Sequence, residues 1–285
     1  MLPIDYDALP AQDIPTCLGL LRVRSIGQGE AIVFWSSLLM DARMWMAQVR
    51  YFSQGYRVVL INPPGHGDSA PLSQPFTFAE CARGVTEVLD ALGLERCHFV
   101  GNSWGGMIGG TFTAMYPNRV GAAVLMNCTG SPAGWRHRLE FPLLATIIRL
   151  LGGFRAGMIG VATRAFVGPT TQRQRPEVIA HIHQALKVCN VDSIAWAVDS
   201  VVPKRPDQMA LLATIRSPVL VVAGKEDRTF AVKETEAMAR AIPGAQFVVM
   251  ERTAHLAALE NPDEVNGLIQ RFLNRVGRPA PTPAS

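Results

Sequence analysis

The sequence predicts an α/β fold with a mostly parallel central sheet, helices on both faces and a helical cap insert. Apolar runs of strand length alternate with segments of helical periodicity along most of the chain, a pattern typical of parallel strands joined by crossover helices. One of these strands ends in a Gly-x-Ser-x-Gly motif that opens a helix of small residues. Residues 130–207 interrupt the alternation and contain no convincing strand.

Continuous apolar runs predict strands that are buried on both faces of a parallel sheet. Proline and other turn residues separate these runs from the helical segments. The elements expected before residue 130 are, in chain order, a strand near 16–25, a strand at 31–35, a helix around 41–52, a strand at 57–62, a helix near 78–92, a strand at 97–100, a helix that Pro117 stops, and a strand at 121–127.

The C-terminal part of the chain returns to the same alternation. The elements expected there are a strand ending at Ala223, a helix near 232–241, a strand at 246–250 and a helix over 262–275. The start of the last helix is well marked, because Asn261 can cap it, Pro262 suits its first turn and Asp263 lies at the positive end of its dipole.

The Gly-x-Ser-x-Gly motif places Ser103 at the turn between a strand and a helix. A serine held there in a strained backbone conformation projects its hydroxyl outward, and side chains two residues away would collide. Gly101 and Gly105 remove those side chains. The motif also occurs by chance, so a nucleophilic role for Ser103 requires a histidine and a carboxylate elsewhere in the chain.

His255 is the candidate base among six histidines. It follows an apolar strand by a short loop and precedes the last helix, so both ends of its loop are anchored. His66 lies in a tight turn where a structural role is expected. The other four histidines lie in a predicted strand or in the insert and are not candidates.

Asp227 is the candidate acid, because it lies on the loop that follows the buried strand ending at Ala223. Glu226 is its neighbour and the local alternative. The loop before the insert offers no alternative acid, because residues 126–130 contain no carboxylate. Serine, acid and histidine therefore occur in the order Ser103, Asp227, His255, each after a predicted parallel strand.

The insert is expected to be a helical cap over Ser103. Segments 141–151 and 179–188 have helical character, and a structureless loop of this length would be improbable in a compact domain. The chain is accordingly divided into a core of residues 1–129 and 208–276, a cap of residues 130–207 and a disordered tail of residues 277–285.

With these three residues in this order, the chain resembles the α/β-hydrolase superfamily, whose catalytic triad of serine, acid and histidine has the same order. The resemblance covers roughly residues 16–276. Its most specific part is Gly101-Asn102-Ser103-Trp104-Gly105-Gly106, and the turn Pro63-Pro64-Gly65-His66-Gly67-Asp68-Ser69 is a second match. The resemblance implies that Ser103, His255 and Asp227 form a catalytic triad.

The resemblance also implies an oxyanion hole made by the backbone N–H groups of Leu38 and Trp104. Members usually carry His-Gly after the first central strand, whereas Ser36-Ser37 stands there in this chain. Backbone donors survive such a change, although loss of the glycine can alter the path of the loop. The 3-oxoadipate enol-lactonases depart from His-Gly similarly, which favours ester or lactone substrates.

We therefore expect a serine hydrolase that cleaves a carboxylic ester or lactone of a small, largely apolar substrate through an acyl-enzyme. No metal ion or organic cofactor is implied. Candidate residues of the substrate pocket are Ser37, Trp35, Met158, Phe166 and Trp196. For each apolar residue of the cap, packing of the cap on the core is the alternative role.

Other functions stay open on the same constellation of residues. Hydrolysis of C–C bonds in vinylogous diketones and cofactor-free haloperoxidase activity can both use it, and the fold also serves as a non-catalytic ligand-binding receptor. A dinucleotide site at residues 65–70 matches Gly-x-Gly-x-x-Ala formally. Pro71 and Pro75 argue against the helix that such a site needs.

The composition is that of a soluble enzyme acting on small molecules. A formal net charge of +4 without a long basic run gives little support to a nucleic-acid partner. Segment 141–151 is too short to span a membrane, and no membrane partner is expected. Five cysteines without paired spacing and the absence of a signal-peptide pattern predict a cytoplasmic location. The sequence is compatible with a homodimer.

Overall fold

The computed structural model describes residues 4–277 and confirms the α/β fold with a mostly parallel sheet. The eight strands are β1 (Ala11–Thr16), β2 (Gly19–Ile26), β3 (Ala31–Trp35), β4 (Arg57–Ile61), β5 (Cys97–Asn102), β6 (Val120–Met126), β7 (Val219–Gly224) and β8 (Gln246–Met250). Their order in the sheet is β1-β2-β4-β3-β5-β6-β7-β8. β2 pairs antiparallel with β1 and β4, and all other pairs are parallel.

The central strands are apolar because both faces of the sheet are covered. Every residue of β3, β6 and β7 is buried, as expected for parallel strands between two layers of helices. The N-terminal region differs from the single strand expected near 16–25. It forms the hairpin of β1 and β2, whose turn ends at Gly19 with a positive φ of 91°.

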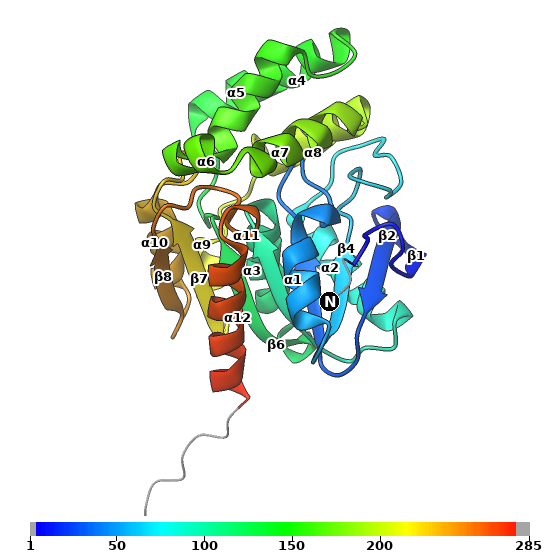
Figure 1. Cartoon of the computed structure of the whole chain (residues 1–285), viewed down its shortest axis with the longest axis vertical. Coiled ribbons are helices and arrows are strands. Elements are labelled where there is room, and N and C mark those ends of the chain that lie inside the picture. The colour runs from blue at the N-terminus through cyan, green and yellow to red at the C-terminus, as the bar shows by residue number, and fades with distance from the viewer. Residues whose placement is uncertain (1–3, 278–285) are drawn as a thin grey trace, which may run out of the picture.

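Helices cover both faces of the sheet (Figure 1). In the core they are η1 (Ala42–Trp45), α1 (Met46–Phe52), α2 (Phe78–Ala91), α3 (Trp104–Met115), η2 (Pro117–Arg119), α9 (Met209–Leu212), α10 (Val232–Ala241), α11 (Ala257–Glu260) and α12 (Pro262–Val276). One cluster of buried residues joins α2, α3 and α10 to the sheet, and a second joins α1 and α12 to the opposite face.

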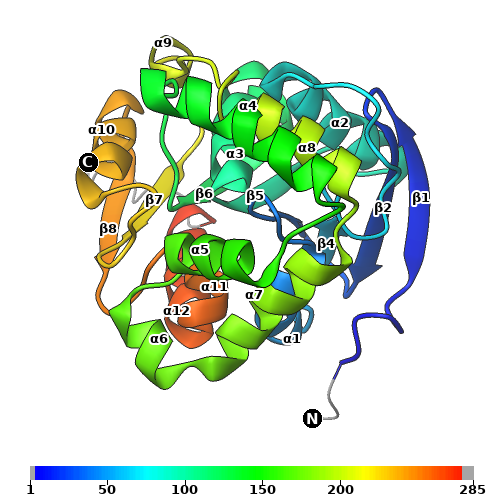
Figure 2. The same ribbon diagram turned by 90° about the horizontal axis from the view of Figure 1, so that it is seen from above.

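Five further helices lie between β6 and β7 in the chain and sit together above the carboxyl ends of the parallel strands (Figures 1 and 2). They are α4 (Trp135–Leu150), α5 (Ala156–Phe166), α6 (Pro169–Gln174), α7 (Pro176–Val188) and α8 (Val191–Val201). The limits expected for the cap, residues 130 and 207, fall in the loops before α4 and α9. Of the tail expected at 277–285, residues 278–285 lie outside the described part of the chain.

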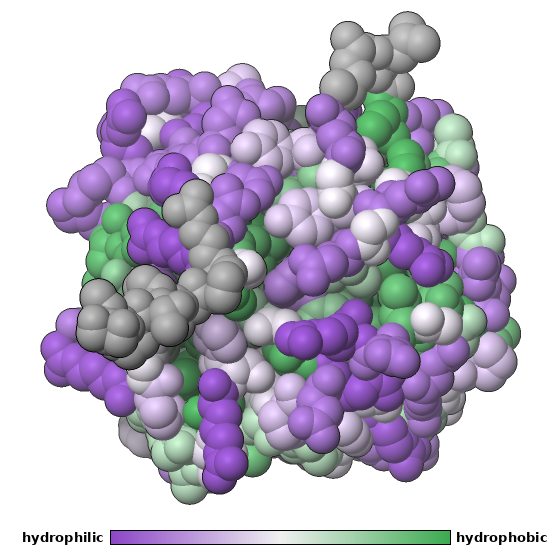
Figure 3. Space-filling view, turned by 90° about the horizontal axis from the view of Figure 1, so that it is seen from below, coloured by the Kyte–Doolittle hydropathy of each residue, from purple (hydrophilic) through white to green (hydrophobic). Residues whose placement is uncertain are grey.

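The face opposite these five helices is mainly hydrophilic, with apolar groups in small separate areas (Figure 3). Within residues 4–277, no helix combines the length and the apolar character needed to cross a membrane. Loops from separate strands converge at the carboxyl edge of the sheet, which the five helices cover. We therefore expect a functional site at this edge.

Candidate active site

Ser103 occupies a strained turn between β5 and α3, with φ 57° and ψ −116°. The two flanking glycines make this turn sterically feasible. A Cβ atom on Gly101 would lie 2.1 Å from the carbonyl oxygen of Gly105, and one on Gly105 would lie 2.1 Å from the carbonyl oxygen of Trp35. No side chain fits at either distance, so the glycines of the motif are required by the close approach of three backbone segments.

The structure brings Ser103, His255 and Asp227 together. His255 Nε2 lies 2.8 Å from Ser103 Oγ, and His255 Nδ1 lies 2.8 Å from Asp227 Oδ2. Because a carboxylate only accepts hydrogen bonds, Nδ1–H donates to Asp227 and Nε2 is left to accept from the serine hydroxyl. All three side chains belong to buried residues, so little water competes with these bonds.

Backbone groups fix the orientation of Asp227. Its Oδ1 accepts hydrogen bonds from the N–H groups of Thr229 at 2.8 Å and Phe230 at 3.1 Å. The neighbouring Glu226 points elsewhere, toward the backbone N–H and the hydroxyl of Thr170 at the start of α6. Asp227, and not Glu226, is therefore the carboxylate beside His255.

The loop that carries His255 is held by Asn102, Asn127 and Phe166, none of which the sequence indicated for this role. The carbonyl oxygen of His255 accepts hydrogen bonds from Asn102 Nδ2 at 2.7 Å and from Asn127 Nδ2 at 2.8 Å. On the other side, the Phe166 ring from α5 stacks on the imidazole with ring centroids 5.8 Å apart. These contacts leave the imidazole little freedom to rotate away from Ser103.

The loop after β3 forms a tight turn next to Ser103. The N–H of Met40 donates to the carbonyl oxygen of Ser37 at 3.0 Å, and Leu39 has a positive φ of 70°. Leu38 occupies the middle of this turn, and its N–H makes no hydrogen bond within residues 4–277. Trp104 is the first residue of α3, where N–H groups have no acceptor inside the helix. Both expected oxyanion donors are thus available.

The side chain of His66 stabilises this turn through a hydrogen bond. Its Nε2 accepts a hydrogen bond from the N–H of Leu39 at 3.1 Å, so its Nδ1–H donates to the carbonyl oxygen of Pro64 at 3.0 Å. The same ring packs against Trp104, with ring centroids 5.3 Å apart. Burial lowers the pKa of His66 to about 4. The imidazole is therefore neutral near pH 7, as both of its hydrogen bonds require.

A cavity of about 550 Å³ lies between these loops and the overlying helices. Ser103 and His255 line it from the core, and α4, α5 and α8 supply most of its apolar wall. Of the five residues predicted for the substrate pocket, Met158 and Phe166 are among those that line this cavity. The lining also contains residues of α4 at helical spacing, beginning with His137 and Phe141, a face that the periodicity of segment 141–151 could have indicated.

Three expected pocket residues lie outside this lining. Trp35 is fully buried in β3 and packs edge-on against Trp104 at 5.6 Å. The Ser37 hydroxyl is buried and accepts a hydrogen bond from Asn102 Nδ2 at 2.9 Å. The ring of Trp196 packs on the core and lies against the Arg149 guanidinium. These side chains take part in the packing between strands and helices. Local sequence does not reveal such packing.

Two cationic residues line the cavity and were not singled out from the sequence. Arg205 lies on the loop after α8, and Arg228 directly follows Asp227. Isolated arginines in loops carry no pattern that marks them in advance. Within the described residues, no group of three or more His, Cys, Asp or Glu side chains could hold a metal ion.

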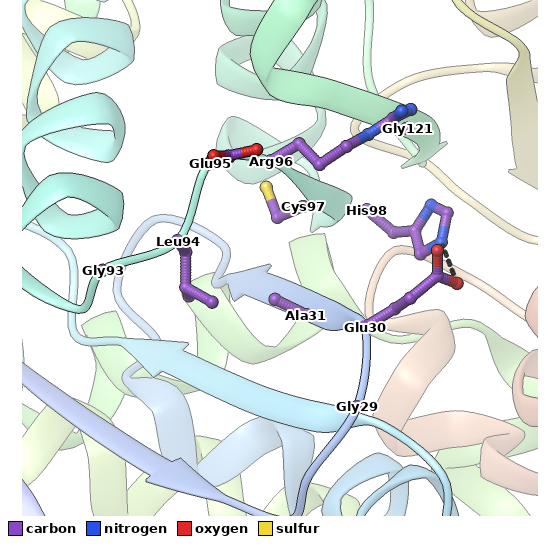
Figure 4. A pocket seen from close by; sticks show the side chains of 10 residues that line it. All are labelled: Gly29, Glu30, Ala31, Gly93, Leu94, Glu95, Arg96, Cys97, His98 and Gly121. Atoms are coloured by element: carbon purple, nitrogen blue, oxygen red, sulfur yellow. Dashed lines mark ion pairs between the residues drawn. The ribbon is translucent and has the colours of Figure 1, made fainter.

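A second, smaller cavity of about 280 Å³ lies at the opposite edge of the sheet, at the amino ends of β3, β5 and β6 (Figure 4). Its polar groups include Glu30 and His98, whose side chains lie 3.5 Å apart. Burial lowers the pKa of His98. This cavity is separated from Ser103 by the length of the strands and takes no part in the site.

The sequence matches the alpha/beta hydrolase family over residues 32–268. The chain belongs to the alpha/beta hydrolase family. The match spans both halves of the core and the five-helix insert, and it includes Ser103, Asp227 and His255. The fold and the superfamily resemblance seen in the sequence are therefore confirmed.

Relatives of this alpha/beta hydrolase include enzymes named for different activities. The 3-oxoadipate enol-lactonase 2 of Acinetobacter baylyi is 26% identical over 274 residues, which are 94% of this chain and 97% of that enzyme. The 2-hydroxy-6-oxononadienedioate/2-hydroxy-6-oxononatrienedioate hydrolase of Cupriavidus pinatubonensis is 32% identical over 228 residues, which are 77% and 76% of the two chains. A thermophilic esterase from Thermogutta terrifontis has a TM-score of 0.88 at 26% identity, covering 94% of this chain and all of that one.

Proposed function

We propose that this alpha/beta hydrolase is a serine hydrolase that cleaves a carboxylic ester or lactone of a small substrate through an acyl-enzyme. The observation that carries the proposal is the unbroken line of hydrogen bonds from Asp227 through His255 to Ser103, each 2.8 Å long, which ends in a largely apolar cavity. Such a line activates a serine hydroxyl, and the cavity accommodates the acyl or ring portion of the substrate.

In the first half of the reaction, Ser103 Oγ attacks the carbonyl carbon while His255 Nε2 takes the hydroxyl proton. The negative charge that develops on the carbonyl oxygen is stabilised by the N–H groups of Leu38 and Trp104. The tetrahedral intermediate then expels the alkoxide, which leaves with the proton from His255. For an ester, the products of this half are the free alcohol and an ester between Ser103 and the acyl group. For a lactone, the released hydroxyl stays attached to the acyl group on Ser103.

In the second half, water replaces the alcohol. His255 takes a proton from the attacking water, the acyl carbon becomes tetrahedral again, and Ser103 leaves with that proton as a hydroxyl. Asp227 keeps Nδ1–H of the imidazole fixed and stabilises its positive charge in both halves. The groups used are side chains and backbone N–H donors of the chain itself, and the reaction needs no redox partner.

Cleavage of a C–C bond in a vinylogous diketone is the second candidate. It is favoured by the relatives named as 2-hydroxy-6-oxo acid hydrolases, which are 27–32% identical to this chain over most of its length. The same Ser103, His255 and Asp227 can serve that reaction. The two candidates differ in the leaving group, which is a carbon atom in one case and an oxygen atom in the other.

A panel of 4-nitrophenyl esters, lactones and vinylogous diketones tests the proposal. We expect turnover of an ester or lactone, a loss of roughly four to six orders of magnitude in kcat for Ser103→Ala, and a loss of roughly four orders for Asp227→Asn. Faster cleavage of diketones than of any ester or lactone would favour the second candidate. Retention of wild-type turnover by either variant would refute the roles given to these residues.

A further inference from the structure

Arg205 places a positive charge in the cavity beside the candidate triad. It lies on the loop after α8 that returns the chain from the five-helix insert to the core. The residue is only 8% exposed and lines the same cavity as Ser103 and His255. A guanidinium so far from bulk water is unusual, because arginine is rarely buried unless it is paired.

No carboxylate neutralises this charge within residues 4–277. Arg205 Nε donates a hydrogen bond to the carbonyl oxygen of Ser131 at 2.9 Å, and the guanidinium makes no ion pair. Burial lowers the pKa of Arg205, and the one acidic residue that opposes this effect, Glu234, is exposed on α10. None of the residues that line the cavity is Asp or Glu.

Arg205 is also close to the reacting groups. Its Cζ atom lies 5.4 Å from the centre of the Phe230 ring, whose centre lies 5.6 Å from that of the His255 ring. The guanidinium and the imidazole therefore pack against the same aromatic ring. A ligand of modest length can reach Arg205 with one end while a carbonyl group lies against Ser103. The remaining wall offers mainly apolar contacts to the carbon atoms between these ends.

We propose that Arg205 forms a carboxylate-binding subsite, so that the substrate is an ester or lactone whose acyl portion carries a carboxylate. This inference rests on the proposed function and narrows its substrate class. With Nε held by Ser131, the two terminal nitrogens of the guanidinium fork are the donors left for an anionic group. The desolvated charge is then paired only when substrate is bound, which couples binding energy to the correct acyl group.

Arg205 has a structural role that the test must separate from substrate binding. Its bond to Ser131 joins the two loops that connect the insert to the core, so its loss can disturb the cavity for every substrate. The ratio of kcat/KM for two esters of equal chain length removes this general effect. Suitable esters are 4-nitrophenyl hydrogen adipate, which ends in a carboxylate, and 4-nitrophenyl hexanoate, which ends in a methyl group.

We expect the wild type to prefer the adipate ester and Arg205→Gln to lower the ratio by about 10-fold to 100-fold, the effect of losing one hydrogen-bonded charge pair. Arg164→Gln is the matched control, because Arg164 is exposed on α5, does not line the cavity and carries the same charge. Its ratio should equal that of the wild type. A ratio in Arg205→Gln within about threefold of the wild type would overturn the proposal.

Calorimetric binding of adipate gives a readout that needs no turnover. If the wild type hydrolyses no ester or lactone, the proposed function fails and the subsite is judged on this binding alone. We expect adipate to bind the wild type at least about 10-fold more tightly than Arg205→Gln. Equal binding by the two proteins, or no binding by the wild type, would contradict a carboxylate subsite. The conservative Arg205→Lys variant serves if Arg205→Gln does not fold, and it should show a smaller loss because it keeps the charge without the fork.

Discussion

In the proposed reaction Ser103 depends on its neighbours for reactivity, since a serine hydroxyl alone is a weak nucleophile. His255 lies 2.8 Å from it and is itself fixed by Asp227, by two asparagine side chains and by the Phe166 ring. Such fixed geometry reduces the reorganisation required during proton transfer. The strained φ of Ser103 serves the same purpose, because it holds Oγ at the end of β5 where the imidazole can reach it.

His66 acts on the other side of the site. It accepts a hydrogen bond from the N–H of Leu39 and packs on Trp104. Leu39 is next to Leu38, one proposed oxyanion donor, and Trp104 is the other. Both nitrogens of its neutral ring are hydrogen-bonded. Protonation would turn the acceptor Nε2 into a donor facing another donor. The turn after β3 is therefore stable only while His66 is neutral.

Acid should destabilise the protein through His66. Burial lowers its pKa from 6.5 to about 4, so between these values the unfolded chain binds a proton that the folded chain does not. Stability from the neutral ring is complete above pH 6.5 and is lost as the pH falls toward 4. Between about pH 7 and pH 4.5, the free energy of unfolding should fall by about 2–3 kcal/mol more in the wild type than in His66→Gln.

Urea unfolding of both proteins at the two pH values measures this difference, and groups common to both chains cancel in it. Glutamine is the suitable replacement because its Oε1 can accept the hydrogen bond from Leu39 without titrating. Equal losses of stability in the two proteins would show that His66 does not titrate as its burial implies.

From residue type and order, sequence reasoning predicted three side chains that the structure brings together. Ser103, Asp227 and His255 each follow a strand end, and parallel strands bring their ends to one edge. It failed for Trp35 and Ser37, because nothing local shows that the space beside β3 is filled by Trp104 and Asn102. Arg205, an isolated arginine in a loop, was also not predicted to line the cavity, because no sequence pattern marks it.

Among the helices and strands, those with marked ends were predicted closely. α10, β8 and the start of α12 agree with the expected 232–241, 246–250 and 262. In the insert, α5, α6 and α8 were not predicted individually. The apolar residues of α5 and α8 face both the core and the cavity, which weakens the periodicity of a single buried face. The length of α6, six residues, is also too short for a periodic signal.

Glu260 at the end of α11 connects the insert to the loop of His255. Its buried carboxylate accepts hydrogen bonds from the N–H groups of Ala254 and Leu256, on either side of His255, and from the hydroxyl of Thr171 on α6. Burial raises the pKa of Glu260. The positions of α6 and of the His255 imidazole therefore both depend on the side chain of Glu260.

Glu260→Gln should lower both the free energy of unfolding, by about 1–3 kcal/mol, and kcat, because an amide cannot accept all these bonds. Glu226→Gln is the matched variant, since the Glu226 carboxylate holds Thr170 on the same helix but makes no hydrogen bond to the loop of His255. The backbone N–H of Glu226 does bond Thr253 of that loop, and the substitution leaves this bond in place. Urea unfolding and ester turnover measure the two effects. Equal kcat values for the two variants would contradict a link between Glu260 and the imidazole.

Across the protein, charge is distributed unevenly. The insert of residues 130–207 contains ten Lys and Arg against five Asp and Glu, whereas the rest of the chain contains 17 against 18. The small net charge thus lies mainly in the part that covers the cavity. A positive potential at that place favours the approach of anionic substrates, which agrees with the subsite proposed at Arg205.

The central claim is that three segments far apart in the chain make one hydroxyl reactive at the carboxyl edge of the sheet. Labelling with a fluorophosphonate probe, followed by mass spectrometry of the intact protein and its peptides, tests this most directly. We predict one adduct, on Ser103, formed at least about 100-fold more slowly in His255→Ala. Folded wild-type protein that stays unlabelled, or that carries the adduct on another residue, would contradict it and favour a non-catalytic binding role.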